Sequence, residues 1–275
     1  MSHPRISAFA GRANGNAKPV RVIEGQSTLF ARTTHDLALD TIHDEIVAPN
    51  SFAEAILFFR GGASGEEKPI RIIQGPDTLL RNPDNVAVDA VHNEVFVASR
   101  EGAVFVYPRE ANGNVAPIRI LQGPQTKIRQ ANRVAIDPEN DLMFITTRFG
   151  SVLTFPRAAQ GDTAPTAVIS GPKTLLSDEH APYRMAVYPE GKRIFVGVGG
   201  SHPLSGAVGG FVAVWKYGDN GDVPPWALIP STPLTGLNHP FGGVAINPAA
   251  KDIMVLENSQ PPGLLVFHAP EVFLK

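Results

Sequence analysis

The chain has 275 residues, 18% of them charged, a formal net charge of −2 and no cysteine. The near-balanced charge excludes the basic footprint of a protein that binds nucleic acid or an anionic membrane. The lack of cysteine excludes disulfides, thiol catalysis and cysteine-ligated zinc. No apolar run is long enough to span a membrane, and residues 1–16 contain no signal-peptide core. We expect a soluble chain of unknown compartment; an extracytoplasmic location would require a signal that had been removed.

The first predicted elements are two short strands, at residues 6–9 and 19–25, and the second of these belongs to a repeat. The sequence "ANGNAKPVRVIEGQST" at residues 13–28 returns as "ASGEEKPIRIIQGPDT" at 63–78 and as "ANGNVAPIRILQGPQT" at 111–126. An internal repeat decides the fold class before any other signal does. Its proline recurs about every fifty residues, at Pro19, Pro69, Pro117, Pro165 and Pro225.

Each copy is followed by short runs rich in Val, Ile and Phe that are bounded by Gly, Pro, Asn and Asp, which is the pattern of β-strands. One run in each unit is "DLALD", "NVAVD", "RVAID", "RMAVY" or "GGVAIN". No segment keeps a helical period over three turns. Four short strands in a unit of about fifty residues predict a propeller blade, with a β-sandwich or a solenoid as the alternatives.

We therefore predict an all-β chain, a β-propeller of four-stranded antiparallel blades that forms a single domain over residues 1–275. The strand count gives five blades, beginning near residues 36, 85, 133, 184 and 243, and six is the alternative. Residues 6–25 are expected to complete the last blade. In this scheme the N-terminal outer strand pairs with the C-terminal blade, which closes the ring and removes an open edge.

The segment "NPDNVAVDAVHNEVFVASREGAVFVYPR" at residues 82–109 resembles the NHL repeat. The resemblance covers essentially the whole chain; it is strong in the copies that start at His35 and Asp84, fair at Asn132, and weak at Tyr183 and Gly242. It implies a β-propeller, commonly of six blades. The activities that it implies are diverse, since the family includes interaction platforms, RNA binders, lyases and lactonase-like hydrolases.

The loops that lead from an outer strand to the next inner strand emerge on the same face as those between the second and third strands. This face surrounds the mouth of the central channel, where binding usually occurs. Its outer-to-inner loops each begin with a basic or potentially basic residue: Arg32, Arg81, Arg129, His180 and His239. Together these could bind an anionic group. Alternatively, each pairs with an acidic neighbour as part of the blade.

Positions nearer the inner strands differ between copies, as a specific pocket would require. They include His35, Asp84, Asn132, Arg133, Tyr183 and Arg184, and the other loops on this face add Asn50, Arg100, Arg148 and Glu257. The long Gly-rich connection at residues 199–210 is either a lid or a tolerated insertion.

Other repeated residues are assigned to structure. Asp40, Asp89, Asp137 and Asn247 are expected to cap the turn after the inner strand. Arg21, Arg71 and Arg119 are expected to keep outer edges from pairing. The repeated Thr28, Thr78, Thr126 and Thr174 are expected to form hydrogen bonds within their loops.

No motif for a nucleophile elbow, a P-loop, a zinc protease or an EF-hand is present, so we predict no catalytic residues. The resemblance to NHL-type lyases makes His35, His180 and His239 candidate zinc ligands. Asp84, Asn132, Asn50 and Glu257 are a candidate calcium set, similar to gluconolactonase-like propellers.

The predicted function is therefore a non-enzymatic binding or interaction module without a cofactor, whose channel-mouth face receives a small anionic ligand or a protein or peptide. The alternative is a metal-dependent hydrolase or lyase of small molecules, such as lactones, with calcium or zinc in the central channel.

Overall fold

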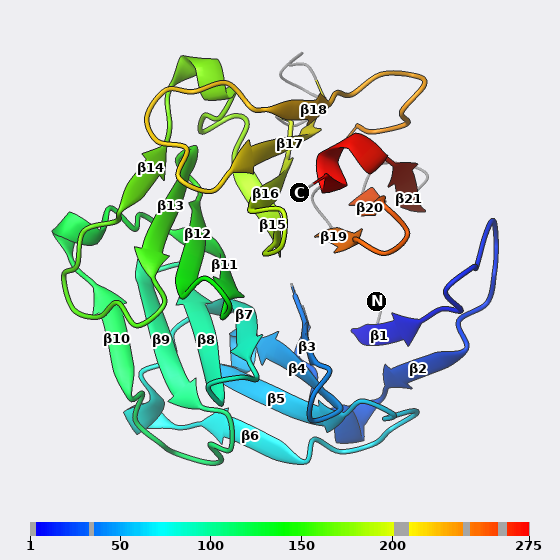
Figure 1. Cartoon of the computed structure of the whole chain (residues 1–275). Coiled ribbons are helices and arrows are strands. Elements are labelled where there is room, and N and C mark those ends of the chain that lie inside the picture. The colour runs from blue at the N-terminus through cyan, green and yellow to red at the C-terminus, as the bar shows by residue number, and fades with distance from the viewer. Residues whose placement is uncertain (1–3, 33–35, 201–208, 239–242, 258–262, 275) are drawn as a thin grey trace. The chain divides into compact units, whose positions relative to one another are not determined.

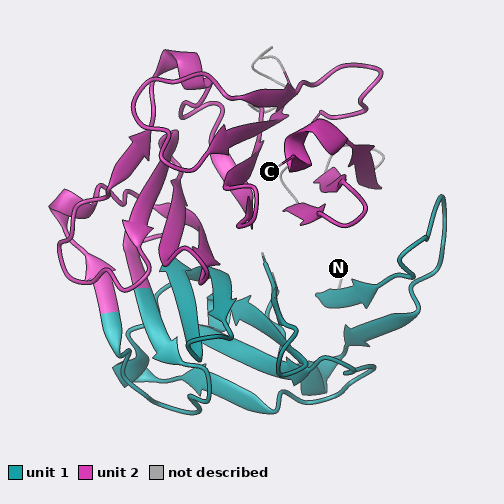
Figure 2. Cartoon of the chain, in the orientation of Figure 1, with its two compact units in different colours: residues 1–99, 105–119 teal, residues 100–104, 120–275 magenta. Residues whose placement is uncertain are grey.

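The computed structural model describes residues 4–32, 36–200, 209–238, 243–257 and 263–274 (Figure 1). Contacts divide the chain into two compact units, shown in Figure 2: unit 1 comprises residues 1–99 and 105–119, and unit 2 comprises residues 100–104 and 120–275.

Apart from an N-terminal two-stranded sheet, the described strands form five sheets that follow one another in the chain, and each sheet keeps its strands in sequence order. We number them as blades. Blade 1 contains β3 (Ala38–Asp40), β4 (Glu45–Asn50), β5 (Ala55–Arg60) and β6 (Arg71–Gln74). Blade 2 contains β7 (Pro83–Asp89), β8 (Glu94–Ser99), β9 (Ala103–Pro108) and β10 (Arg119–Gln122). Blade 3 contains β11 (Ala131–Asp137), β12 (Leu142–Thr147), β13 (Ser151–Pro156) and β14 (Ala167–Ile169). Blade 4 contains β15 (Pro182–Tyr188), β16 (Arg193–Val198), β17 (Phe211–Lys216) and β18 (Ala227–Ile229). Blade 5 contains β19 (Gly243–Asn247), β20 (Asp252–Glu257) and β21 (Gly263–His268).

The predicted fold class is confirmed: the chain is an all-β propeller of five, mostly four-stranded, antiparallel blades, without an α-helix in the described residues. The strands form because β-branched and aromatic residues alternate between two faces, and both faces of a blade are covered by neighbours. In β5, for example, every residue except the last is buried. The described part of the chain contains no helix that is long and apolar enough to cross a membrane.

The N-terminal residues form a sheet of their own, in which β1 (Arg5–Ala8) pairs with β2 (Arg21–Glu24). Blade 5 ends at β21 in the described residues. The pairing of residues 19–25 with the C-terminal blade, and the single domain that follows from it, therefore stay predictions.

The repeated sequence links four outer strands to the following repeat within a unit. Leu121 of β10 forms a one-residue parallel bridge with Gly161, the glycine of the following repeat. The Gln122 N–H donates to the Gly161 carbonyl at 3.0 Å, and the Gly161 N–H donates to the Ile120 carbonyl at 2.7 Å. The same bridge joins three other pairs, namely Ile23 with Gly65, Ile73 with Gly113, and Ile169 with Gly221. The repeat is therefore a connection between blades.

Short 3-10 turns follow four outer strands, and their threonines act as the sequence predicted. The turns are η1 (Gln26–Thr28) after β2, η3 (Pro76–Thr78) after β6, η4 (Pro124–Thr126) after β10 and η5 (Pro172–Thr174) after β14. The Thr126 hydroxyl donates to the Gly123 carbonyl at 2.7 Å and accepts from the Ile128 N–H at 3.2 Å. These bonds satisfy backbone groups that the turn would otherwise bury unpaired.

The predicted Asx caps are also confirmed. The Asp40 carboxylate accepts from the backbone N–H groups of Ile42 and His43 at 3.0 and 2.9 Å. Equivalent bonds to the next turn form at Asp89, Asp137 and Asn247.

Separate apolar cores fill the two units. In unit 1, Ile46, Leu57 and Phe59 are buried together. In unit 2, Trp215 and Phe144 lie in one cluster. The turn η6 (Pro270–Phe273) places Phe273 in a second cluster, where its ring stacks on Phe195 at 5.5 Å between centroids. These cores hold the loops of each unit in place.

Candidate functional site

Three of the predicted basic positions, Arg32, Arg81 and Arg129, are exposed, and two of these three have defined neighbours. In unit 1, Arg81 forms an ion pair with Glu54 at 2.9 Å, and Arg32 is exposed. In unit 2, the Arg129 guanidinium lies 4.6 Å from the centroid of the Phe149 ring. These contacts match the alternative in which the arginines belong to the blade surface, and the anion site stays a prediction. His35 and His239 lie outside the described residues.

The candidate residues at the start of the inner strands are largely buried. Asp84 is buried in unit 1. In unit 2, the amide of Asn132 is buried and donates to the Pro182 carbonyl at 3.1 Å. The buried Arg184 donates to the Tyr183 carbonyl at 3.3 Å. Arg133 and Tyr183 are half-buried. Asn132 of β11 is therefore hydrogen-bonded to the first residue of β15, the inner strand of the next blade.

The candidate residues from the loops between the second and third strands are also either buried or exposed. Asn50 is buried; it donates to the Leu29 carbonyl at 2.7 Å and accepts from the Ala31 N–H at 2.9 Å. Glu257 is buried and accepts from the Asn238 N–H at 2.8 Å. Both side chains hold a loop by its backbone. Two further candidates, Arg100 and Arg148, are exposed.

The residues that are described do not include a group of three or more His, Asp and Glu side chains suited to a metal ion. The amide oxygen of Asn50 and a carboxylate oxygen of Glu257 are already occupied by backbone N–H groups. The calcium set stays a prediction, and we derive no chemistry from a metal. The proposed zinc set includes His35 and His239 and is not described.

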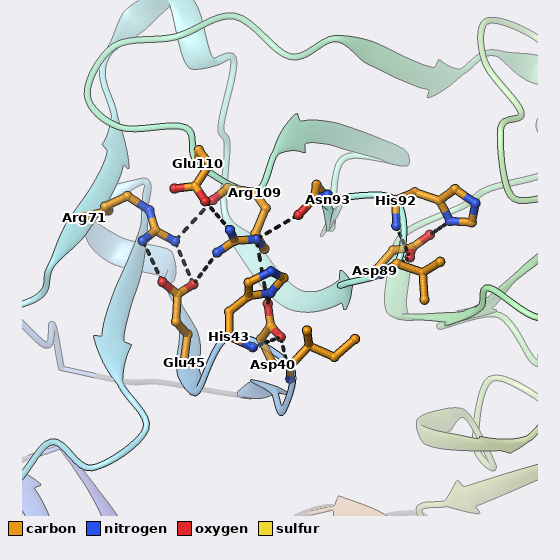
Figure 3. A network of polar contacts seen from close by, with 11 residues as sticks. Asp40, His43, Glu45, Arg71, Asp89, His92, Asn93, Arg109 and Glu110 are labelled. Carbon is orange, nitrogen blue, oxygen red and sulfur yellow. Dashed lines mark hydrogen bonds and ion pairs between the residues drawn. The ribbon is translucent and has the colours of Figure 1, made fainter.

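The densest charged cluster lies in unit 1, on the side of the Asx caps (Figure 3). Glu45 accepts two hydrogen bonds from Arg71, both at 2.7 Å, and one from Arg109 at 3.2 Å. Arg109 also donates to Asn93 at 3.2 Å and pairs with Glu110. The Arg71 guanidinium lies 4.5 Å from the Phe58 ring centroid.

This cluster corrects the role predicted for the outer-strand arginines. Arg71 folds across its own blade to Glu45, and Arg119 reaches Glu94 in the same way at 2.6 and 2.7 Å. The reason is electrostatic, because a forked guanidinium gains more from a bidentate carboxylate in a partly buried place than from the solvent. Arg71 and Arg119 each link the outer strand of a blade to the second strand of the same blade, and we do not assign them the role of keeping outer edges from pairing.

Two carboxylates, those of Glu45 and Asp40, are held ionised. Hydrogen bonds from Arg71 lower the pKa of Glu45, against burial, which raises it. For Asp40 burial is the largest single effect and would raise the pKa, but hydrogen bonds from His43 and Ile42 together bring it below its usual value. Neither group is therefore poised as an acid or base near neutral pH, and we assign the cluster to structure.

An apolar pocket in unit 2 is the strongest candidate for a binding site. It has a volume of about 460 Å³, which is within the usual range for small-ligand sites. It is lined by Pro172, Leu175, Leu176, Ser177, His180, Gly209, Phe211, Leu228, Pro230 and Ser231.

One wall of the pocket is the loop between β14 and β15. Leu175 ends η5 with a φ of 64°, which turns the chain so that the next leucine enters the core. Ser177 and His180 close a tight turn: the His180 N–H donates to the Ser177 hydroxyl at 3.0 Å, and the Ser177 N–H donates to the His180 carbonyl at 3.2 Å. The shape of this wall is therefore fixed by local hydrogen bonds.

The opposite wall comes from β17, β18 and the end of the long connection at residues 199–210. The His180 imidazole stacks on the Phe211 ring, with centroids 6.2 Å apart and 30° between the planes. The Ser231 hydroxyl donates to the Leu237 carbonyl at 2.6 Å. Because this polar group is used within the protein, the pocket presents mainly aliphatic and aromatic surface and suits an apolar group.

Among the described residues, His180 is the only sequence-predicted site residue that lines this pocket. The leucines and Phe211 were missed because apolar residues in a β-repeat indicate core. The one available signal was the enlarged connection of blade 4, since Gly209 at its end lines the pocket. Residues 201–208 of that connection lie outside the described residues.

A second, polar pocket of about 320 Å³ lies in unit 1. It is lined by Arg81 and Glu54, which pair with each other, and by Gln74, whose amide donates to the Ala53 carbonyl at 2.8 Å. Its polar groups are therefore already paired.

Comparison by sequence finds no matching protein family and no similar curated protein. Comparison of structures finds similar chains in the crystal structure of a mitotic checkpoint complex and in hydrazine synthase from Kuenenia stuttgartiensis. The first has a TM-score of 0.58 at 11% identity and covers 86% of this chain and 63% of that chain. The second has a TM-score of 0.56 at 9% identity and covers 86% of this chain and 66% of that chain. The chain thus spans just under two thirds of either, and the likeness shows the fold alone.

Proposed function

We propose that this five-bladed propeller is a non-enzymatic binding module whose unit 2 pocket receives an aliphatic or aromatic group of its partner, such as a side chain of a protein. The observation that carries the proposal is the pocket of about 460 Å³ between Leu175, Phe211 and Leu228. Burial of one apolar side chain there would contribute about 1.5–3 kcal/mol to binding.

Two further points support an interaction role. The loops that form the pocket belong to the type on which propellers carry binding residues. One structurally similar chain is part of a mitotic checkpoint complex, which is an assembly of proteins. We also propose that the repeats are of the NHL type. The anionic ligand predicted from the arginines would bind apart from this pocket, whose walls carry no Arg or Lys.

The chain offers a matched pair of leucines to test the pocket. Leu175 and Leu79 occupy the same place after their 3-10 turns, with φ values of 64° and 59°. Each is 45% exposed. Only Leu175 lines the unit 2 pocket. The substitutions Leu175→Glu and Leu79→Glu therefore carry the same backbone cost. They differ in that only the first changes a residue that lines the unit 2 pocket.

The experiment is a fluorescence titration with anilinonaphthalene sulfonate, an aromatic probe that brightens in apolar surroundings. We expect saturable binding to the wild-type protein and to Leu79→Glu, and at least a tenfold weaker affinity for Leu175→Glu, because a carboxylate on the pocket wall must lose water when the probe binds and repels the probe's sulfonate. Equal affinity for the two variants, or no saturable binding to the wild type, would contradict the proposal.

A further inference from the structure

Two cations of blade 4, in unit 2, lie opposite each other on neighbouring strands. Arg193, the first residue of β16, is paired across the sheet with Lys216, the last residue of β17. At the same place in blade 1, Glu45 is paired with Arg60, so the charges there are opposite. Like charges directly opposite each other destabilise a sheet. Blade 4 therefore carries an electrostatic cost that blade 1 avoids.

Neither cation forms an ion pair within the described part of the chain. The Arg193 guanidinium donates to the backbone carbonyls of Gly191 and Lys192, and its Nε is buried without a hydrogen-bond partner among the described residues. Asp219 lies on the turn after β17, but its carboxylate accepts from the backbone N–H of Lys216 at 2.8 Å. The fold thus brings two positive charges together, and the described residues supply no carboxylate that pairs with them.

An exposed tryptophan lies against both cations. Trp226, which precedes β18, is 41% exposed. The Arg193 guanidinium carbon lies 4.6 Å and the Lys216 ammonium nitrogen 5.5 Å from the centroid of its ring. An indole attracts cations through the negative face of its π-system, but it has no net charge with which to neutralise them. We call Arg193, Lys216 and Trp226 the cationic tryptophan cluster.

Complete blades show that this place in a blade faces the solvent. In blade 1, the following repeat belongs to the same unit, and Arg60 and Ile70 are exposed at the places of the lysine and the tryptophan. The same holds in blade 3, within unit 2, for Pro156 and Thr166. Ile70, Thr166 and Trp226 are equivalent because each donates its N–H to the carbonyl two residues before the end of the third strand. The cluster is therefore exposed by its place in the blade.

We propose that the cationic tryptophan cluster binds an acidic side chain of a partner protein. The aspartate or glutamate carboxylate lies between the Arg193 guanidinium and the Lys216 ammonium group and accepts hydrogen bonds from both, which offsets the repulsion between them. The exposed Trp226 ring packs against the apolar part of the same segment. Tryptophan and arginine are also the side chains that most often dominate the affinity of protein interfaces.

A side chain of a protein suits this cluster better than a free anion or a nucleic acid. None of the three residues lines either pocket described above, so a free anion would keep most of its water there. The net charge of −2 disfavours binding of a polyanion. A protein segment is held by further contacts, so a single carboxylate can add to its affinity without a pocket. The cluster is thus a site separate from the apolar pocket of unit 2.

The test uses the full chain and two peptides, acetyl-AEAEA-amide and acetyl-AQAQA-amide. In an extended peptide the two glutamates lie on one face, about 7 Å apart, which offers the cluster two carboxylates. The chain has two tryptophans, and Trp215 is fully buried, so a titration of tryptophan fluorescence reports on Trp226. At low ionic strength we expect saturable binding of AEAEA with a dissociation constant below about 1 mM, weaker binding as salt is added, and no binding of AQAQA.

The variant Lys216→Glu separates binding from folding. It should weaken AEAEA binding at least about tenfold. It should also raise the urea midpoint above that of the wild type, because the new carboxylate lies opposite Arg193. A matched control is Lys127→Glu, which makes the same change of charge at another exposed lysine of unit 2 and should leave binding unchanged. Leu175→Glu should also leave it unchanged, so this inference and the proposed function can fail separately.

Three results would overturn the proposal. The first is the absence of saturable AEAEA binding by the wild type. The second is an equal affinity of Lys216→Glu and Lys127→Glu for AEAEA. The third is an equal change in fluorescence with sodium acetate at the same carboxylate concentration, which would assign the cluster to free anions.

Discussion

Replacement of Glu45 by glutamine tests whether the charged cluster of Figure 3 holds blade 1 together. Glutamine keeps the shape of the side chain and loses its charge. The carboxylate accepts two hydrogen bonds from Arg71, one at each oxygen, and a third from Arg109 at Oε2. The side chains of these two arginines are 15% and 8% exposed. After the substitution, two largely buried guanidinium groups face a neutral amide.

The expected cost follows from the burial of these groups. Removal of one partner from a buried ion pair costs about 3–5 kcal/mol, because it leaves an uncompensated charge. The glutamine oxygen still accepts one bond, and Arg109 keeps its contact with Glu110, so the lower end applies. We expect a loss of about 3 kcal/mol in the free energy of unfolding. For a chain of this length that is a fall of about 6–10 °C in Tm.

The assay is urea and thermal unfolding followed by circular dichroism. A control is Glu67→Gln, which removes a bidentate pair to the exposed Arg60 and should leave the urea midpoint unchanged. A second control is the double variant Glu45→Leu with Arg71→Ala. Blade 3 carries Leu142 and Ala167 at these places, so this pair of residues is compatible with a blade. The double variant should be more stable than Glu45→Gln. A loss below about 1 kcal/mol for Glu45→Gln would refute the reasoning, since exposed pairs contribute that little.

Three further outcomes are expected. The pKa of Glu45 is lower in the folded protein than in the unfolded chain. The stability that Glu45 contributes is therefore complete above its pKa in the unfolded chain and is lost as the pH falls through its pKa in the folded protein. Acid unfolding of Glu45→Gln should therefore depend less steeply on pH than that of the wild type. Gly123→Ala should lower Tm more than Gly161→Ala, because both glycines have positive φ but only the first would force a Cβ into a neighbouring carboxylate. Tyr217→Phe, which removes a 2.8 Å hydrogen bond to Asp137 from a buried hydroxyl, should cost about 1 kcal/mol in urea unfolding.

The fold could be predicted because its determinants are local and repeated. Thr126 closes its turn through residues three before it and two after it, and Asp40 caps residues two and three beyond itself. Such bonds depend on spacing along the chain, so they are visible in the sequence. The bridge from Leu121 to Gly161 joins residues much farther apart, and only the regularity of the repeat hinted at it.

The candidate site could be predicted only in part, because its chemistry depends on neighbours that are distant in sequence. Arg81 was expected to face a ligand, but Glu54 on the preceding turn neutralises it. Asn50 and Asn132 were predicted to face a pocket; the amide of Asn50 donates to the loop carbonyl of Leu29, and that of Asn132 donates to the carbonyl of Pro182 at the start of β15. Apolar pocket residues such as Leu228 cannot be distinguished from core residues without their exposure.

The end of β18 differs from the ends of the other outer strands, and it lines the pocket in blade 4. At the end of β14, the Ser170 N–H donates to the Gly221 carbonyl at 3.2 Å and completes the link to the next blade. The equivalent residue after β18 is Pro230, since Ile169 and Ile229 lie opposite Val152 and Val212 at the same place in their blades. Proline has no N–H, so β18 cannot complete this link. Its edge therefore stays open, and Leu228 and Pro230 line the pocket.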